Sequence, residues 1–293
     1  MRYKIENEHL AVEIDPLGAE LKSIKSKITG REYMWCGDPK YYKRTSPILF
    51  PVVGSLKNKQ YVFEGKKYTL PQHGFARDLE FERIEAKDDE AWFMLRYTDK
   101  TYENYPFEFD FRIGYKIIGK TLRVMWKIYN LGETPMYFSI GSHSEFNCPL
   151  NGEDNKREYA LAFDAEHGLL VSKIDEEGLM YNSKTELQLT NGKLNIPDDF
   201  FDEGAYIIEN YQVSEVSLLD PKGKPYITVN FDAPVVGIWS PEKKNAPFVA
   251  IEPWFGRCDR ESFDGRLCDR EWSNMIDVGG IFNRHYEITV GED

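Results

Sequence analysis

The chain has 293 residues, of which 41% are hydrophobic and 14% aromatic, so it can bury a large core. Its 37 basic and 49 acidic residues give a net charge of −12, which argues against a nucleic-acid-binding protein, because phosphates require a basic surface. The sequence shows neither an apolar stretch of membrane-spanning length nor the apolar segment of a signal peptide. We therefore expect a cytoplasmic protein without a membrane partner.

The four cysteines indicate reduced thiols. Cys36, Cys148, Cys258 and Cys268 are far apart and form no CxxC pair, so a structural zinc site is not expected. Glycine-rich nucleotide loops and the motifs of zinc proteases and serine hydrolases do not occur either. The sequence therefore gives no support to a bound nucleotide cofactor or to serine hydrolysis.

Apolar and polar residues alternate along most of the chain, which is typical of strands with one buried face. The alternation begins at Leu10, Val12 and Ile14, and residues 61–70 indicate a hairpin that turns near Glu64 and Gly65. We expect strands, with loops between them, to account for nearly the whole chain.

The clearest alternation covers residues 107–129. Six apolar residues at every second position are followed by a turn at Gly119 and Lys120, and four more apolar residues then alternate. This pattern predicts two long antiparallel strands, and residues 216–231 repeat it around a turn at 220–223. Residues 151–158 are expected to form a polar loop within the domain.

No window of twelve or more residues has the spacing of an amphipathic helix. Two packed antiparallel sheets are the natural way to bury so many strands with one apolar face each. We therefore predict an all-β chain, an antiparallel β-sandwich that forms a single domain over residues 1–293.

Two of the five histidines lie in shaped loops at strand ends. His73 is flanked by Pro71 and Gly74, and His143 follows an apolar strand and precedes Pro149. Histidine suits general acid–base chemistry because its pKa is close to neutral pH. The alternative is that both are hydrogen-bonded loop histidines without a chemical role.

Glu252 is the most conspicuous carboxyl group, because it lies near the end of the apolar run 248–256, before Pro253 and Trp254. Burial there would disfavour its charge and make it a usable general base. The alternative is an ordinary ion pair with a nearby Arg or Lys. Glycoside hydrolysis by two carboxyl groups is another possibility that the sequence leaves open.

The alternating Asp and Arg residues of 257–270 indicate an ion-paired surface loop.

Taken in order, six segments resemble the aldose 1-epimerase family, and more narrowly its LacX-like branch. The resemblance runs along nearly the whole chain, and each segment alone is weak. The segments are residues 17–24, 46–54, 72–78, 143–149, 237–240 and 251–254.

This resemblance implies a galactose mutarotase-like antiparallel β-supersandwich with a sugar-binding cleft on one sheet. It implies an isomerase that interconverts the α and β anomers of a hexose or related sugar without a metal or cofactor. Glu252 would be the base for the anomeric hydroxyl, His143 the acid for the ring oxygen, and His73 a second donor. Further sugar-binding residues implied by the resemblance or lying near its motifs are Arg77, Asn147, Trp239, Lys57 and Asp202.

The chain departs from the family pattern at residues that read sugar hydroxyls. Ser55 stands where relatives often carry Arg, and Gly204 stands where they often carry Asp. Lys57 lies two residues beyond Ser55, either Asp202 or Glu203 is a candidate to replace the missing Asp, and Glu145 adds a charge beside the cleft.

Two other functions stay open. A hexose-6-phosphate 1-epimerase would need a basic phosphate site, with Arg77, Lys57 and Arg44 as candidates. A non-catalytic carbohydrate-binding protein could use the same fold. In each case we expect a small-molecule sugar partner and a monomer or homodimer.

Overall fold

A computed structural model of the chain describes residues 1–150, 152 and 155–291. Nearly all of its regular structure is antiparallel strand. Among the described residues, helical structure is limited to one four-residue α-helix and short 3₁₀ turns. These are α1 (Asp99–Tyr102), η1 (Lys57–Lys59), η2 (Ala76–Asp78), η3 (Lys156–Glu158) and η4 (Leu267–Asp269). The prediction of an all-β chain is confirmed.

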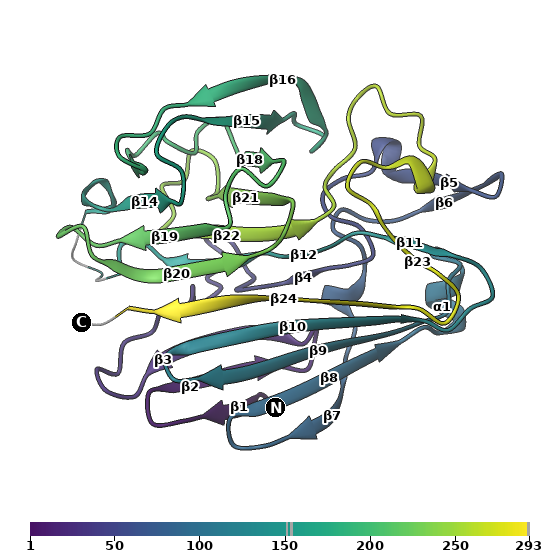
Figure 1. The fold of residues 1–293 in the computed structure, drawn as a ribbon, viewed down its shortest axis with the longest axis horizontal. Coiled ribbons are helices and arrows are strands. Elements are labelled where there is room, and N and C mark those ends of the chain that lie inside the picture. The colour runs from purple at the N-terminus through teal and green to yellow at the C-terminus, as the bar shows by residue number, and fades with distance from the viewer. Residues whose placement is uncertain (151, 153–154, 292–293) are drawn as a thin grey trace.

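Two large sheets dominate the described part of the chain (Figure 1). The first has nine strands in the spatial order β17 (Lys193–Asn195), β14 (Ala160–Phe163), β19 (Glu215–Leu219), β20 (Pro225–Phe231), β24 (Ile281–Val290), β10 (Thr121–Asn130), β9 (Phe109–Ile118), β8 (Glu90–Arg96) and β7 (Glu82–Ala86). The second follows the order β16 (Met180–Leu187), β15 (Leu169–Ile174), β18 (Tyr206–Glu209), β21 (Val235–Trp239), β22 (Phe248–Phe255), β12 (Ile140–Ser142) and β4 (Ile48–Leu49), and β13 (Ser144–Asn147) also pairs with β22.

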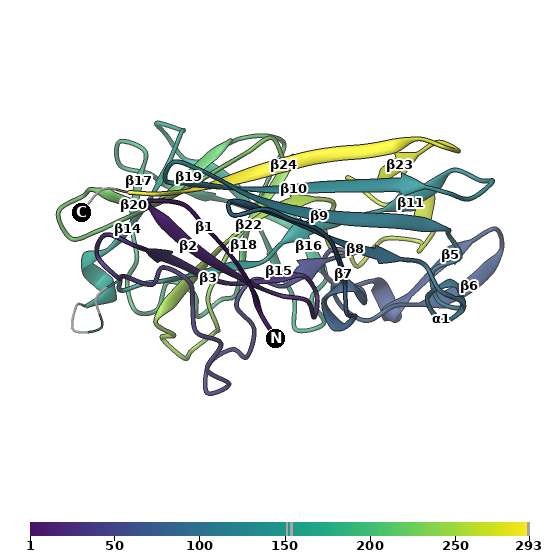
Figure 2. The ribbon, with the colours of Figure 1, turned by 90° about the horizontal axis from the view of Figure 1, so that it is seen from below.

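Smaller sheets complete the architecture. The N-terminal strands β1 (Tyr3–Glu6), β2 (Leu10–Asp15) and β3 (Glu20–Ser26) form a sheet of their own, which Figure 2 shows beneath the long strands β24, β10 and β9. Two-stranded sheets join β5 (Gln60–Phe63) to β6 (Lys66–Thr69) and β11 (Met136–Phe138) to β23 (Asn274–Ile276).

Aromatic side chains fill the space between the large sheets. The Trp126 ring of β10 lies 6.3 Å from the Phe255 ring of β22, and Phe255 lies 5.5 Å from Phe282 of β24. All ten alternating apolar residues predicted between 107 and 129 are at most 4% exposed. Burial of every second side chain therefore holds β9 and β10 against the second sheet.

The predicted turns are also found. β9 and β10 are joined at Gly119, whose φ of 59° suits a tight hairpin turn, and β5 and β6 are joined at Glu64 and Gly65. The strands β19 and β20 flank the predicted turn at 220–223. One hydrophobic core includes residues from β1, β9, β10 and β22. The single domain over 1–293 stays a prediction that this shared core favours.

Two predictions about polar segments need correction. Residues 156–158 of the expected polar loop form η3, and Lys156 is buried because its amine donates to the backbone oxygens of Ala246 and Phe248. Residues 151, 153 and 154 of that loop lie outside the described residues.

The segment 257–270 is only partly a surface loop. Arg257, Asp259 and Arg270 are at most 5% exposed. Arg270 Nε lies 2.7 Å from Asp259 Oδ1, and Arg257 Nε lies 2.7 Å from Glu209 Oε1. Opposite charges in contact allow these side chains to be buried, which their sequence pattern does not reveal.

Candidate active site

The strand β22 carries Glu252 into the interior. All eight residues of β22 are buried, and Glu252 is the only ionisable residue among them. Glu252 is 2% exposed, and no described residue donates a hydrogen bond to its Oε2. Burial raises the pKa of Glu252 well above its usual value, with the Trp254 indole opposing the shift. A carboxyl group in this state suits proton removal near neutral pH.

His143 lies across from Glu252 on the neighbouring strands. β12 and β13 flank His143, and both pair with β22, with Gly141 opposite Trp254 and Ser144 opposite Ile251. The same register sets His143 opposite Glu252, with both side chains on one face of the sheet. His143 Nε2 is 3.3 Å from Glu252 Oε2. The fold thus brings a potential acid and a potential base into contact.

Glu145 holds the other side of the His143 ring. It lies two residues further along and therefore on the same face, and its Oε1 is 2.6 Å from His143 Nδ1. Glu145 has no exposed surface. Burial, helped by the Arg77 charge, lowers the pKa of His143 to about 3, whereas burial and the Glu252 charge raise the pKa of Glu145. The sequence indicated only an added charge at this position.

His73 is fixed by Gly54. Its backbone N–H donates to Gly54 O at 2.9 Å, and the Gly54 N–H donates to the ring Nδ1 at 3.1 Å. Because Nδ1 accepts a hydrogen bond, the ring proton is on Nε2, and burial lowers the pKa so that the ring is neutral. His73 has a φ of 66°, a strained conformation that these two bonds hold. The site therefore contains a neutral N–H donor 5.7 Å, between ring centres, from His143.

Trp254 lies flat across two glycines. A Cβ on Gly141 would come within 2.4 Å of Trp254 Cδ1, and a Cβ on Gly237 within 2.8 Å of its Cζ2. The indole Nε1 donates to the backbone oxygen of Ser142 at 3.1 Å. Glycine at both neighbouring positions thus makes room for an aromatic surface beside Glu252.

Two more rings surround His143. The Tyr42 ring stacks on the imidazole with ring centres 5.5 Å apart, and Trp239 meets it edge-on at 5.2 Å. Burial raises the pKa of the Tyr42 phenol, so this hydroxyl stays protonated. Aromatic rings packed around a positioned polar group are typical of small-molecule sites.

These residues line a cavity of about 800 Å³. The basic residues of the lining are Lys43, Arg44 and Arg77. The acidic residues other than Glu252 are Asp175, Glu176, Glu177 and Glu242. Arg77 donates to the backbone oxygen of Gln72, and Arg44 forms an ion pair with Asp78 at 2.6 Å. The lining therefore carries both signs of charge.

Five of the eight predicted site residues line this cavity. They are Glu252, His143, His73, Arg77 and Trp239. Residues that the sequence analysis did not select also line it. The principal ones are Tyr42, Gln72, Glu242 and Trp254. Tyr42 belonged to no motif in the sequence, whereas Gln72 began the motif that contains His73 and Trp254 belonged to the motif that contains Glu252.

The other three predicted site residues lie outside the cavity lining. Asn147 donates its amide to the backbone oxygen of Glu32 at 3.0 Å. Lys57 lines a separate hollow, where its amine donates to Phe263 O at 3.4 Å. Asp202 belongs to a turn in which its backbone N–H donates to Asp199 O.

The two departures from the family pattern have local consequences. Ser55 is buried, and its Oγ lies 2.6 Å from where a Cβ on Gly178 would stand. Gly204 has a φ of 79°, and a Cβ there would lie 2.9 Å from Glu242 Oε1. Glu242 therefore brings a carboxylate to the position where the family resemblance leads one to expect an Asp.

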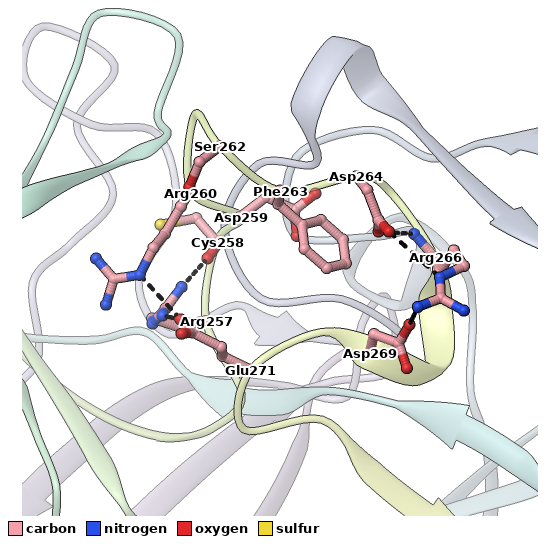
Figure 3. Close-up of a pocket in the computed structure, with 10 residues that line it drawn as sticks. All are labelled: Arg257, Cys258, Asp259, Arg260, Ser262, Phe263, Asp264, Arg266, Asp269 and Glu271. Atoms are coloured by element: carbon pink, nitrogen blue, oxygen red, sulfur yellow. Dashed lines mark hydrogen bonds and ion pairs between the residues drawn. The ribbon is translucent and has the colours of Figure 1, made fainter.

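A second hollow of about 460 Å³ lies beside the first and shares Cys258 with it (Figure 3). Its charged side chains neutralise one another. Arg266 pairs with Asp264 and Asp269, and Arg257 pairs with Glu271. This lining contains no histidine, so it lacks the acid–base pair found in the larger cavity.

Within the described residues, no three His, Cys, Asp or Glu side chains converge as a metal-binding group. The four cysteines are free thiols. No helix in that part of the chain has the length and apolar character needed to cross a membrane. The expectation of a reaction without metal or cofactor stays a prediction.

Comparison with known proteins gives a consistent result. A family model described as aldose 1-epimerase matches residues 1–278. The plasmid-encoded protein LacX of Lactococcus lactis subsp. lactis is 32% identical, with 99% of each chain covered. A galactose mutarotase related enzyme from Lactobacillus acidophilus has a TM-score of 0.94 at 33% identity, covering 100% of this chain and 98% of that one. A galactose mutarotase-like protein from Lactobacillus casei has a TM-score of 0.92 at 28% identity, covering 99% and 100%.

Proposed function

Because the chain belongs to the aldose 1-epimerase family, we propose that it interconverts the α and β anomers of a free sugar. One observation supports this above all: Glu252 and His143 lie 3.3 Å apart, both buried, at a cavity that is also lined by Tyr42, Trp239 and Trp254. The two oxygens that exchange protons during ring opening are bonded to the same anomeric carbon. A base and an acid that act on them must therefore lie side by side.

The reaction needs two coordinated proton transfers. Glu252 takes the proton of the anomeric hydroxyl, the bond between the anomeric carbon and the ring oxygen breaks, and the ring oxygen takes a proton from His143 Nε2. The open aldehyde rotates about the bond between its first two carbons. Closure on the other carbonyl face, with the roles reversed, gives the opposite anomer.

The remaining groups bind the sugar and exclude water. His73 offers an Nε2–H to the ring oxygen or a neighbouring hydroxyl, since its Nδ1 is occupied by Gly54. Trp254 and Trp239 provide the apolar surface. Water excluded by these rings would strengthen the interactions of Glu252 and His143 with the substrate.

The charges of the lining favour an uncharged sugar. A sugar phosphate would find Lys43, Arg44 and Arg77 in the cavity, but Lys57 lies elsewhere. It would also face Glu242 and the acidic residues of 175–177. We therefore rank a free hexose or pentose above a hexose 6-phosphate. The cytoplasmic location and the monomeric or homodimeric state stay predictions.

The test is NMR exchange between the α and β anomeric protons with catalytic amounts of protein. The panel comprises glucose, galactose, mannose, xylose and glucose 6-phosphate. We expect faster exchange for at least one free sugar and a smaller effect on glucose 6-phosphate. Faster exchange for the phosphate alone would support the phosphate-specific epimerase instead. Binding of a sugar without faster exchange would identify a non-catalytic carbohydrate-binding protein.

A further inference from the structure

We propose that Glu145 is a positioning residue that shares a proton with His143, so that a neutral Glu145–His143 pair acts as the acid. The inference rests on the proposed function, because it concerns the proton that His143 delivers to the ring oxygen. It is carried by the 2.6 Å contact between Glu145 Oε1 and His143 Nδ1.

The backbone holds Glu145 firmly in place. Its N–H donates to Thr45 O at 3.0 Å, and its carbonyl oxygen accepts from the Trp35 N–H at 2.9 Å. Its side chain has no exposed surface and points along the sheet face to His143. The short contact therefore follows from the strand geometry of β13 and does not depend on a mobile side chain.

Glu20 is a buried carboxyl group that is well supplied with hydrogen-bond donors. It is 8% exposed, and its Oε1 accepts from the N–H groups of Thr45 and Ser46 at 2.6 and 3.0 Å. Lys22 Nζ is 3.2 Å from the same oxygen. Several donors and a cation together compensate for lost hydration.

Glu145 has much less of this support. Among the described residues, its Oε2 has no hydrogen-bond partner, and its Oε1 contacts His143 alone. A charged Glu145 would thus be buried with a single neutral partner. The lower-energy arrangement places the proton on the carboxyl group, which then donates to Nδ1.

The surrounding charges favour the same arrangement. The charges facing the Glu145 carboxyl group are mainly negative, whereas the imidazole faces both the Glu252 carboxyl group and two guanidinium groups. Glu252 and Glu20 face Glu145, with Lys22 the compensating cation, whereas Arg77 and Arg44 face His143. The neutral rings of His73, Tyr42 and Trp239 complete the enclosure of the imidazole.

The Glu145–His143 pair avoids the anion that His143 alone would form on giving up its proton. Burial first, and then the Arg77 charge, lower the pKa of His143 to about 3, so the ring does not carry a second proton at neutral pH. A neutral imidazole that simply released its Nε2 proton would become an imidazolate anion. A proton arriving from Glu145 at Nδ1 avoids that charge.

The transfer is balanced. The Nε2 proton of His143 moves to the ring oxygen while the Glu145 proton moves to Nδ1, leaving a neutral imidazole and a Glu145 carboxylate. At the same time Glu252 gains the proton of the anomeric hydroxyl. The enzyme thus begins with its extra proton on Glu145 and ends with it on Glu252, and ring closure reverses the sequence.

The test combines ¹⁵N and ¹H NMR of the His143 ring in the sugar-free protein with kinetics of Glu145→Gln. We expect a protonated Nε2, a hydrogen-bonded Nδ1 and a strongly deshielded shared proton in the wild type. Glutamine can still donate an N–H to Nδ1 but cannot release a proton. Exchange should therefore fall about 100-fold at unchanged KM. The alkaline fall in rate, which marks loss of the shared proton, should disappear.

Glu32→Gln is the matched control, because Glu32 is a largely buried carboxylate that binds the backbone of Ile24 and Met34 without touching His143. It should keep the wild-type pH profile. A wild-type spectrum with a bare Nε2, or a Glu145→Gln variant with the wild-type rate and pH profile, overturns the inference. If that variant does not fold, the wild-type spectrum decides alone. Absence of exchange in the wild type would refute the proposed function, whereas the spectrum would still locate the proton.

Discussion

Replacing Glu252 by Gln should slow catalysis severely and also stabilise the protein. The amide has nearly the shape of the carboxyl group and can keep the contact with His143 Nε2, now 3.3 Å from Glu252 Oε2. It cannot accept the proton of the anomeric hydroxyl. It also carries no charge, so the variant removes the desolvation that a 2% exposed carboxylate suffers.

The expected magnitudes can be worked out separately. Loss of a general base lowers the rate by roughly 10²- to 10⁴-fold, or about 3–5 kcal/mol in transition-state free energy. Removing an unsatisfied buried group gains about 1–3 kcal/mol of folding free energy. With an unfolding entropy of about 2.1 cal/mol/K per residue, a chain of 293 residues should then melt roughly 2–5 °C higher.

The gain in stability should depend on pH. The folded-state pKa of Glu252 is raised, first by burial, so between the unfolded and the folded pKa the folded protein holds more protons. Wild-type stability therefore falls as pH rises through that interval. Glutamine does not titrate, so the difference in Tm should be largest above the folded pKa and disappear below the unfolded one.

Thermal melts from acid to neutral pH, together with anomer exchange by NMR, test this prediction. Glu209→Gln is the matched control, because Glu209 is also 2% exposed. Burial opposes the charge of Glu209, but the Arg257 guanidinium outweighs it and lowers the pKa, so this variant should lose stability. A Glu252→Gln protein that melts below the wild type at neutral pH, or that keeps full exchange, would refute the reasoning.

Three further variants test the surroundings of the acid–base pair. His73→Asn should fold, because Asn tolerates the φ of 66°, but exchange should fall roughly 10- to 100-fold by NMR as the ring N–H donor is lost. Gly141→Ala should cost about 1–3 kcal/mol in thermal unfolding, because its Cβ would strike Trp254, whereas Gly132→Ala meets no atom closer than 3.5 Å and should not. Arg77→Ala should raise the KM of free and phosphorylated sugars alike. A loss confined to the phosphate would contradict the preference for an uncharged sugar.

Much of the fold could be predicted because the strands carry their burial pattern in the sequence. The alternation along 107–129 predicted β9, β10 and the turn at Gly119 nearly to the residue. The strand β22 is different, because it is buried on both faces and all eight of its residues are buried. A continuous apolar run identifies such a strand less clearly, and here Glu252 interrupts the run.

The site could be predicted only as separate motifs. His143 and Glu252 are more than one hundred residues apart, and only the register of β12 and β13 on β22 places them opposite each other. Lys57 is close to a motif in the sequence but lies away from the cavity in the fold. It follows a motif that contributes to the site, yet η1 carries its side chain to another hollow. Proximity along the chain to a motif does not establish proximity to the cavity.

The protonation of buried acids shows most clearly what sequence cannot provide. Four glutamates in the described part of the chain are at most 8% exposed, namely Glu20, Glu145, Glu209 and Glu252. Glu209 is held by Arg257, and Glu20 by backbone donors and Lys22. Glu145 and Glu252 share one partner, the imidazole of His143, and no cation contacts either carboxyl group among the described residues. Within the described chain, the fold gives the first two acids a cation in contact and gives the second two none. Proton transfer is therefore expected where the support is missing.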